Sequence, residues 1–288
     1  MNLLHIFYGI LGAILAAFIW AFLIEPRWYR LRKVTIRGQK KLKKPITILH
    51  LSDIHFVKNE GSKRPFFQKL SMLNPDLIFL TGDIIDNDEG IDTAARVISG
   101  LRARYGTFLV LGNHEYYDYH VLDNIRYHLG LGKTSIHRNN VPRFISEMKR
   151  IGVHVLINES TRLQVHGTEV LIGGTDDPVT QKVDFERALH GLGPGTLNIL
   201  LIHHLDGILK LSHHGVDLAF AGHTHGGQIR LPILGPLVCE TKLGRHYVEG
   251  LHDYKGTTAF VSRGMGAGRA LTPRFACRPE AIWFEVEP

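Results

Sequence analysis

Cysteine is scarce in this sequence. Only Cys239 and Cys277 occur among 288 residues, and they do not form a C-x-x-C pair. Two cysteines are too few to cross-link a fold of this size or to build a cysteine-ligated zinc site. Internal repeats and low-complexity tracts are also missing. We therefore expect a globular chain with one large domain or two small ones, and two free thiols; a single disulfide is the alternative.

Net positive charge is missing from most of the chain, although the total is +7. Residues 25–44 contain nine basic residues and one acidic residue, whereas residues 45–288 contain 25 basic and 26 acidic residues. A nearly neutral body without interleaved aromatic and basic side chains argues against a nucleic-acid-binding protein. The basic residues instead mark one short segment near the N-terminus.

No charged residue lies between Ile6 and Ile24. This run approaches the roughly 20 apolar residues that cross a bilayer as a helix. A cleaved signal peptide would have basic residues before the run and a small-residue cleavage site after it, and a core helix would show a polar stripe. We predict a transmembrane anchor over residues 1–24, a basic juxtamembrane linker over 25–44 and a folded domain over 45–288.

The basic segment that follows the anchor predicts its orientation. Lys and Arg residues next to a membrane span are retained on the cytoplasmic side, so the folded domain is expected there. Each basic residue near an anionic membrane surface contributes about 1 kcal/mol of attraction. The sequence therefore predicts contact with anionic lipid headgroups, although a solvated linker would have the same composition.

Five apolar runs end abruptly in polar residues that can bind metals. They are ITILHLSDIH (46–55), DLIFLTGD (76–83), GTFLVLGNHE (106–115), LNILLIHH (197–204) and VDLAFAGHTHGGQ (216–228). Apolar runs of this length predict buried strands, and the intervening segments 65–73 and 91–104 predict helices. Further helices are expected at 142–150 and 185–190, and further strands at 34–37, 153–157, 162–166, 169–173, 258–261 and 282–286. Parallel strands gather their carboxyl ends at one edge of a sheet, where ligands bind.

The side chains delivered to this edge predict a metal site. The candidate ligands are Asp53, His55, Asp83, Asn113, His203, His223 and His225. Carboxylate, imidazole and amide donors suit Mn, Fe or Zn. In an extended chain, Asp53 and His55 would point the same way. Asp86 is expected to support its loop, because short Asp side chains commonly satisfy turns. Surface or core positions are expected for the remaining candidates, His50, His213, His214, His246 and His252.

The motifs DIH, GDIID, GNHE, IHH and GHTHGG resemble, one by one and in order, those of the calcineurin-like metallophosphoesterase superfamily. The anchor and the ending RPEAIWFEV are similar to its membrane-associated bacterial branch. The resemblance implies an α/β fold, a double β-sheet sandwich flanked by helices, with a two-metal site. It assigns Asp53, His55 and His225 to one metal, and Asn113, His203 and His223 to the other. Asp83 would bridge both metals, and His114 would stand over the scissile phosphate.

The resemblance predicts a metal-dependent phosphohydrolase at a bacterial inner membrane. Its two divalent metal ions are expected to be Mn, with Fe or Zn as alternatives. Two metals can activate water and clamp a phosphoryl group, and glycines 226 and 227 would let the backbone approach the metal. The anchor favours an amphipathic substrate with a phosphodiester or pyrophosphate bond, for which UDP-2,3-diacylglucosamine is a candidate. A broad phosphodiesterase acting on glycerophospholipids or nucleotides is the alternative, and a non-catalytic metal-binding scaffold is a second.

Two further predictions concern the substrate. The C-terminal arginines can form forks with phosphate oxygens, and the candidates are Arg263, Arg269, Arg274 and Arg278. The long segment 116–141 follows the predicted site and would be either a substrate lid or an ordinary surface excursion.

Overall fold

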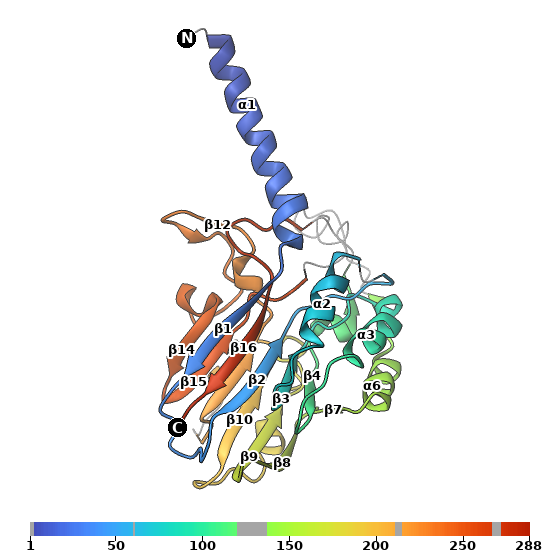
Figure 1. Ribbon diagram of the computed structural model, residues 1–288, viewed down its shortest axis with the longest axis vertical. Coiled ribbons are helices and arrows are strands. Elements are labelled where there is room, and N and C mark those ends of the chain that lie inside the picture. The colour runs from blue at the N-terminus through green and yellow to red at the C-terminus, as the bar shows by residue number, and fades with distance from the viewer. Residues whose placement is uncertain (1–2, 60, 120–136, 211–214, 267–271) are drawn as a thin grey trace.

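Two six-stranded β-sheets pack face to face in the computed structural model, and one apolar helix projects from them (Figure 1). The structure describes residues 3–59, 61–119, 137–210, 215–266 and 272–288. The predicted α/β double-sheet sandwich is confirmed. In order across the first sheet, its strands are β1 (Arg30–Ile36), β16 (Glu280–Val286), β2 (Ile46–Leu51), β3 (Leu77–Thr81), β4 (Thr107–Val110) and β7 (Val153–Val155).

The second sheet lies behind the first and contributes the other half of the site. Its strands, in order, are β14 (Gly250–Tyr254), β15 (Thr257–Val261), β11 (Leu218–Ala221), β10 (Leu197–Leu201), β9 (Thr168–Gly174) and β8 (Glu159–Val165). Strands β9, β10, β11 and β15 are parallel, as are β2, β3, β4 and β7 in the first sheet. Strand β14 was not predicted, and it forms the antiparallel edge beside β15.

Apolar residues fill the space between the sheets. Phe79, Phe108, Phe220, Phe260 and Phe284 all belong to this buried cluster. Helices cover the other face of the first sheet (Figure 1), namely α2 (Arg64–Leu70), α3 (Ile91–Ile98) and α6 (Val141–Arg150). Every residue of β3 is buried because both of its faces are covered, which explains why its sequence is a continuous apolar run.

Strand β1 corrects the predicted boundary between linker and domain. It pairs in parallel with β16 along its whole length, from Arg30 beside Glu280 to Ile36 beside Val286. Arg30 also forms a 2.6 Å ion pair with the fully buried carboxylate of Glu280. The middle of the basic segment 25–44 is thus an edge strand of the domain. A strand was predicted only at 34–37, because its partner lies some 250 residues away in sequence.

The N-terminal helix fits a single-pass membrane anchor. Helix α1 (Leu3–Ile19) continues through the π-helical turn Trp20–Ile24 into a 3₁₀ turn at Glu25–Arg27, so that 25 residues form one helical rod. None of the residues of α1 is buried. A core helix of the same composition would be covered by other elements, whereas this helix projects away from the domain with no other element packed along it (Figure 1).

Contacts with the C-terminal segment fix the foot of this helix. Glu25 is only 2 % exposed, and its carboxylate accepts the Trp20 indole N–H at 2.7 Å and the Ala276 backbone N–H at 3.0 Å. The backbone N–H of Cys277 donates to the same carboxylate, and that of Arg274 donates to the Ala21 carbonyl at 2.9 Å. The anchor therefore joins the domain through a docked turn and not through a free tether.

Several predicted elements differ in length. The helix expected over 91–104 ends at Ile98, although Leu101 beyond it still packs into the core. In the excursion predicted over 116–141, residues 120–136 lie outside the described part of the chain. Next to that gap, the two short strands Tyr117–Asp118 and His137–Arg138 pair with each other. Both cysteines are free, as predicted.

His50 lies in the core and gives a pH-dependent prediction. Its ring faces Phe220, Phe260 and Phe284, and its Nε2 lies 2.8 Å from the Thr81 hydroxyl. Burial lowers the pKa of His50 to about 3. An unfolded histidine titrates near pH 6.5, so below that pH the unfolded chain takes up a proton that the native protein does not. The free energy of unfolding should then decrease by about 1.4 kcal/mol per pH unit between about pH 6 and pH 4.

The variant His50→Leu should lack this component of the pH dependence. Urea unfolding of both metal-free proteins in mild detergent measures the difference between their slopes, since all other groups are common to both. Identical slopes for the two proteins would show that the imidazole does not titrate in this way.

Candidate metal centre

The carboxyl ends of five strands meet at one edge of the sandwich, and backbone hydrogen bonds hold them together. The Asp53 N–H after β2 donates to the Gly82 carbonyl after β3 at 3.0 Å. The Gly222 N–H after β11 donates to the His203 carbonyl after β10 at 2.9 Å. The His223 N–H then donates to the Asp53 carboxylate at 2.9 Å and links the two sheets. The strand ends predicted to converge do so.

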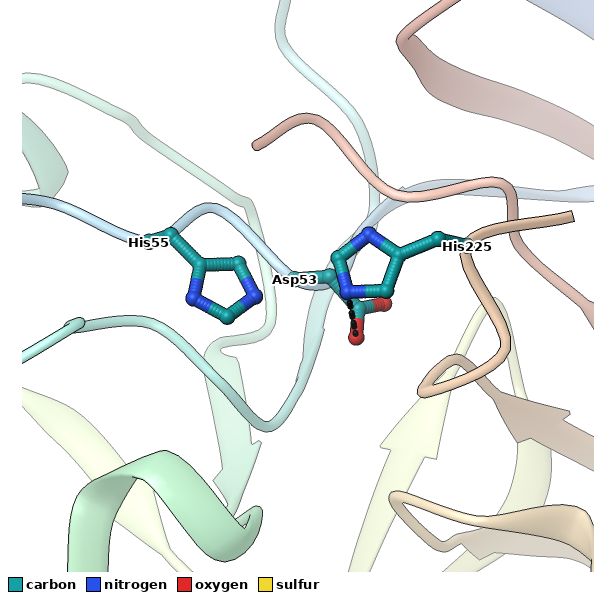
Figure 2. Close-up of side chains that lie close together, drawn as sticks. All are labelled: Asp53, His55 and His225. Carbon is teal, nitrogen blue, oxygen red and sulfur yellow. Dashed lines mark ion pairs between the residues drawn. The ribbon is translucent and has the colours of Figure 1, made fainter. Parts of the chain in front are cut away.

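One group of candidate ligands consists of Asp53, His55 and His225 (Figure 2). One ligand atom from each lies within 4.8 Å of the others, and His225 Nε2 is 3.7 Å from Asp53 Oδ1. The sequence suggested that extended backbone would point Asp53 and His55 the same way. The backbone at these residues is not extended. Asp53, His55 and His225 have φ values of 49°, 51° and 50°. This left-handed conformation is uncommon outside glycine and is concentrated at functional sites.

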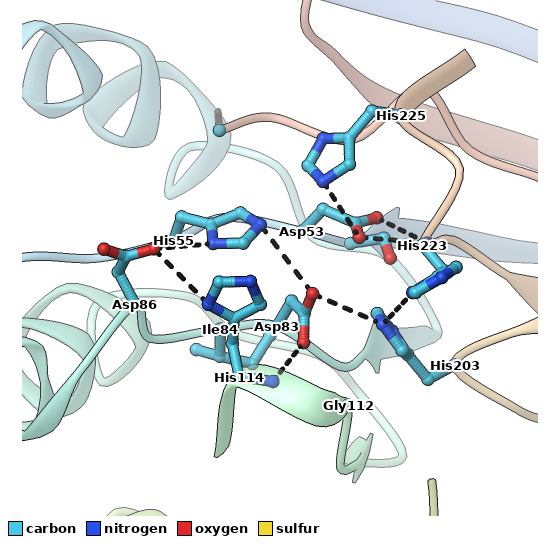
Figure 3. A network of polar contacts seen from close by, with 12 residues as sticks. Asp53, His55, Asp83, Ile84, Asp86, Gly112, His114, His203, His223 and His225 are labelled. Atoms are coloured by element: carbon cyan, nitrogen blue, oxygen red, sulfur yellow. Dashed lines mark hydrogen bonds and ion pairs between the residues drawn. The ribbon is translucent and has the colours of Figure 1, made fainter. Parts of the chain in front are cut away.

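The second group consists of Asp83, His203 and His223 (Figure 3). Asp83 Oδ2 lies 3.3 Å from His203 Nε2, and that nitrogen lies 3.1 Å from His223 Nδ1. Asp83 Oδ2 is also 3.8 Å from His55 Nε2 in the first group. Asp83 and His223 again have positive φ, at 52° and 71°. Asp83 therefore lies between the two groups, where a bridging ligand would have to lie.

Two buried atoms fit a cation better than a hydrogen-bond partner. Asn113 Oδ1 and His55 Nε2 are buried, and neither forms a hydrogen bond within the described part of the chain. Such atoms carry a desolvation cost unless something coordinates them. Asn113 begins the short helix α4 (Asn113–Tyr116), which follows β4 directly. The carbonyl oxygen and the imidazole nitrogen are both suitable donors for a divalent metal.

The protonation of the histidines also fits metal binding. Burial lowers the pKa of His223 and of His225 well below the usual value, which leaves both rings neutral, the form that coordinates metals. Burial also lowers the pKa of His203, but the carboxylates of Asp83, Asp53 and Asp177 together outweigh it and the net shift is upward. Positive charge is thus favoured beside Asp83. A metal ion would supply that charge in place of the proton.

Sequence comparisons agree with this geometry. The family profile described as calcineurin-like phosphoesterase matches residues 46–227. The uncharacterized metallophosphoesterase YkuE of Bacillus subtilis is 33% identical over 242 residues, covering 83% of this chain and 76% of that protein. The chain belongs to the calcineurin-like phosphoesterase family. It is therefore a metal-dependent phosphoester hydrolase, in a family that uses two metals.

Two relatives have more specific names. Phosphodiesterase YaeI of Escherichia coli is 27% identical over 274 residues, which cover 91% of this chain and 90% of that protein. UDP-2,3-diacylglucosamine pyrophosphatase LpxG of Chlamydia trachomatis is 26% identical over 317 residues, which cover 94% and 93%.

His114 follows the candidate ligand Asn113 in this phosphoesterase, and two aspartates hold it. Its backbone N–H donates to Asp83 Oδ1 at 2.9 Å, and its ring Nδ1 lies 3.4 Å from Asp86 Oδ1. Asp86 Oδ1 also lies 3.2 Å from His55 Nδ1 (Figure 3). The sequence predicted that Asp86 supports its loop rather than binding a metal, and this stays a prediction, because Asp86, His55 and His114 form a third group of side chains that could hold a metal ion. The Asp86 carboxylate bonds to one candidate metal ligand, His55, and lies next to the ring of the candidate catalytic histidine, His114.

Glycines allow the phosphoesterase strand ends to approach, but the important ones differ from those expected. A Cβ on Gly82 would lie 2.7 Å from the Gly112 nitrogen, and one on Gly112 would collide with the Asp83 carboxylate. A Cβ on Gly222 would collide with Ser52 and Asp53. The glycines at 226 and 227 instead pack against Arg263, Cys277 and Pro236. They therefore allow the loop that carries His225 to pack closely, and their predicted role beside a metal stays a prediction.

Glu115 was missed by the sequence analysis, although it ends the GNHE motif. Its fully buried carboxylate accepts the backbone N–H groups of Gly112 at 2.7 Å, Asp83 at 2.9 Å, Ile84 at 2.7 Å and Ile85 at 3.2 Å. Burial raises the pKa of Glu115 to about 7, and the Gly112 and Ile85 donors act in the opposite direction. This side chain joins the loops that follow β3 and β4.

The variant Glu115→Gln should weaken both folding and metal binding. An amide nitrogen would face backbone N–H groups that lose their acceptor, which costs about 3 kcal/mol of unfolding free energy. Metal affinity should fall about 10- to 100-fold, as for other groups that orient ligands. Urea unfolding and metal titration measure the two effects. Glu186→Gln, at an exposed site in α7 (Phe185–Ala188), is the matched control, and equal behaviour of the two variants would contradict this role.

The arginines predicted to bind phosphate have other contacts. Arg263 forms an ion pair with Glu249, including an Nη2–Oε1 distance of 2.7 Å, and Glu249 also pairs with Arg230 at 3.1 Å. Arg274 is fully buried and donates to the Gly266 carbonyl at 2.7 Å, with its Nη2 3.3 Å from His225 Nδ1. Arg278 lies over the Trp28 ring, 3.8 Å from its centroid. Arg269 lies outside the described residues. Arg274 thus contacts a candidate metal ligand, and the substrate role of Arg263 stays a prediction.

The remaining histidines have separate surroundings. His204 Nε2 lies 2.8 Å from the Glu240 carbonyl, so His203 is the member of the pair that joins the cluster, as the family resemblance implied. His50 is in the core, and His252 bonds to the Glu249 carbonyl. His213 and His214 lie outside the described part of the chain.

Proposed function

We propose that this protein is a membrane-anchored two-metal phosphohydrolase that cleaves a phosphodiester or pyrophosphate bond in a lipid-linked substrate. The observation that carries the proposal is the position of Asp83 between two ligand groups, in a domain whose membrane helix is docked beside them. A phosphate group must reach this cluster, and a lipid-linked molecule can do so without leaving the membrane.

Seven side chains would hold the metals. Asp53, His55 and His225 would hold one, Asn113, His203 and His223 would hold the other, and Asp83 would serve both. When bound, two metals would supply activation of water and neutralisation of charge on a phosphoryl group. We propose Mn²⁺, with Fe or Zn as alternatives, because the donors are carboxylate, imidazole and amide.

His114 would act on the phosphate. Asp86 lies at its Nδ1, which leaves Nε2 for a substrate oxygen. Burial lowers the pKa of His114, so the free ring is neutral at pH 7. The negative charge of a bound phosphate would favour the protonated ring, which can then stabilise the equatorial oxygens or protonate the leaving oxygen. We therefore expect His114 to carry its proton only when the phosphate of a substrate is bound.

The membrane location comes from the anchor and its flank. The basic residues that follow α1 favour a cytoplasmic domain at a bacterial inner membrane, in contact with anionic lipids. Cys277, which binds Glu25 at the foot of the anchor, also donates its Sγ–H to the His225 carbonyl at 3.2 Å. Two contacts, from Glu25 to Cys277 and from Cys277 to His225, therefore connect the anchor foot to a candidate metal ligand. This proximity favours an amphipathic substrate.

UDP-2,3-diacylglucosamine is the specific candidate, supported by the similarity to the Chlamydia trachomatis pyrophosphatase. A broad phosphodiesterase acting on glycerophospholipids or nucleotides is the second candidate, supported by the similarity to the Escherichia coli phosphodiesterase. A non-catalytic scaffold has little support, because all seven predicted ligands and His114 are present.

The test uses purified full-length protein in detergent with Mn²⁺. We expect hydrolysis of bis-p-nitrophenyl phosphate, and faster hydrolysis of UDP-2,3-diacylglucosamine than of its soluble analogue UDP-N-acetylglucosamine. Inactivity on the UDP-lipid with activity on the simple diester would eliminate the specific candidate. Inactivity on every diester and pyrophosphate with both metals bound would eliminate the hydrolase proposal itself.

A further inference from the structure

A small hairpin beside the metal centre exposes four large apolar side chains. Strands β12 (Arg230–Leu231) and β13 (Gly235–Pro236) form the hairpin, and Ile233 at its tip is completely exposed. Leu234, Leu237 and Val238 are 61 %, 53 % and 55 % exposed. Single exposed apolar residues are ordinary on a protein surface, whereas four within six residues mark a contact surface. We call residues 230–238 the apolar hairpin.

The apolar hairpin lies at the end of the domain from which the anchor leaves (Figure 1). Its first strand follows Gln228, whose carbonyl accepts the Phe275 N–H at 3.0 Å, and the Arg230 N–H donates to the Phe275 carbonyl at 2.9 Å. The residue before Phe275, Arg274, donates its N–H to the Ala21 carbonyl in the anchor foot. One short segment thus connects the hairpin and the anchor. Both must face the same surface.

The surroundings of the anchor foot match the headgroup layer of a membrane. A cavity of about 360 Å³ lies there, and its lining includes Trp20, Trp28, Arg30 and Arg278. Within the described chain, Arg278 has no carboxylate within ion-pair distance, and its guanidinium stacks on Trp28. Tryptophan is enriched at membrane interfaces, and cationic side chains attract anionic headgroups. Apolar and cationic groups therefore lie side by side at this end of the domain.

We propose that the apolar hairpin inserts into an anionic bilayer next to α1 and forms a second membrane contact. This inference rests on the membrane anchorage proposed above. A single helix would leave the domain free to turn about the helix axis, whereas two contacts fix which face meets the lipid. His225 lies only a few residues before the hairpin, and Gly227 packs on Pro236 within it. The second contact would thus hold the loop that carries His225 close to the membrane surface.

The test follows the environment of the hairpin tip in full-length protein reconstituted into vesicles of phosphatidylcholine and phosphatidylglycerol. An environment-sensitive fluorophore is attached to Leu234→Cys in a Cys239→Ser background, since Cys277 is buried and unreactive. We expect a blue-shifted emission that acyl-chain nitroxide lipids quench, because interfacial apolar segments enter about 5–10 Å below the headgroups. The same label on Lys40→Cys, in the turn at the far end of β1, should remain in water.

A second variant makes the result specific. Adding Ile233→Glu to the labelled protein should abolish the blue shift and the quenching, because a carboxylate resists transfer into the acyl region. Val179→Glu, at another exposed apolar position, should change neither. Emission from residue 234 that matches that from residue 40, in protein that pellets with the vesicles, would overturn the inference. Protein that fails to pellet would instead overturn the anchor, and neither readout depends on hydrolysis.

Discussion

Replacing Asp83 with asparagine should remove most of the activity and at least one of the two metals. The Asp83 carboxylate lies 3.3 Å from His203 Nε2 and 3.8 Å from His55 Nε2, so it is placed to serve both ligand groups. Burial raises its pKa, but the surrounding His203 and His114 hold the pKa of Asp83 well below its usual value. The neutral amide cannot supply the charge that two cations require. We expect kcat with bis-p-nitrophenyl phosphate to fall at least about 10³-fold.

Elemental analysis of the purified protein measures bound metal, and steady-state hydrolysis measures kcat. Asp92→Asn is the matched control, because Asp92 is 77 % exposed on α3 and forms an ion pair with Arg143 on the surface. It should keep full metal content and full activity. An Asp83→Asn protein with two bound metals and near-normal turnover would refute the bridging role.

The second large effect is expected for His114→Asn, which should lose turnover and keep its metals. His114 contacts the ligand Asp83 only through its backbone N–H, and any residue at this position retains that bond. Its ring lies next to Asp86 and within 4.5 Å of the His55 ring, measured between centroids. Loss of a group that transfers a proton or stabilises phosphoryl charge lowers kcat about 10²- to 10⁴-fold.

Metal content and kcat are measured together, and KM should change much less than kcat. His190→Gln is the control, because His190 is an exposed histidine in the turn that follows α7. Unchanged kcat in the metal-loaded His114→Asn protein would show that this ring does not take part in the reaction. Loss of metals from that protein would mean that it acts as a ligand.

The candidate ligands could be read from the sequence because each motif is local. A buried strand predicts where its last residue will lie, and the two or three polar residues that follow are placed by the turn alone. Asp53, Asp83, Asn113, His203 and His223 each follow a strand of this kind. Parallel pairing then brings those ends together, so the ligand cluster could be predicted without knowing which strands are neighbours.

Side chains that act across the fold could not be read in this way. Asp86 was expected to support its own loop, yet its carboxylate contacts His55 and His114, which come from different strand ends. Glu115 binds the loop after β3 from the loop after β4. The left-handed backbone at Asp53, His55 and His225 is likewise stabilised by the surrounding packing, because isolated residues of these types rarely adopt it.

The sequence by itself determined three features of this phosphoesterase: an apolar N-terminal helix, a nearly uncharged remainder of the chain, and candidate metal ligands at the ends of buried strands. Periodicity and turn residues act over a few positions, and they are legible one segment at a time. Only the tertiary structure decided that the basic segment is a strand beside β16, that Glu25 docks the anchor on residues 276 and 277, and that the apolar hairpin lies next to it. These arrangements depend on contacts between residues up to about 250 positions apart, which only the closed fold specifies.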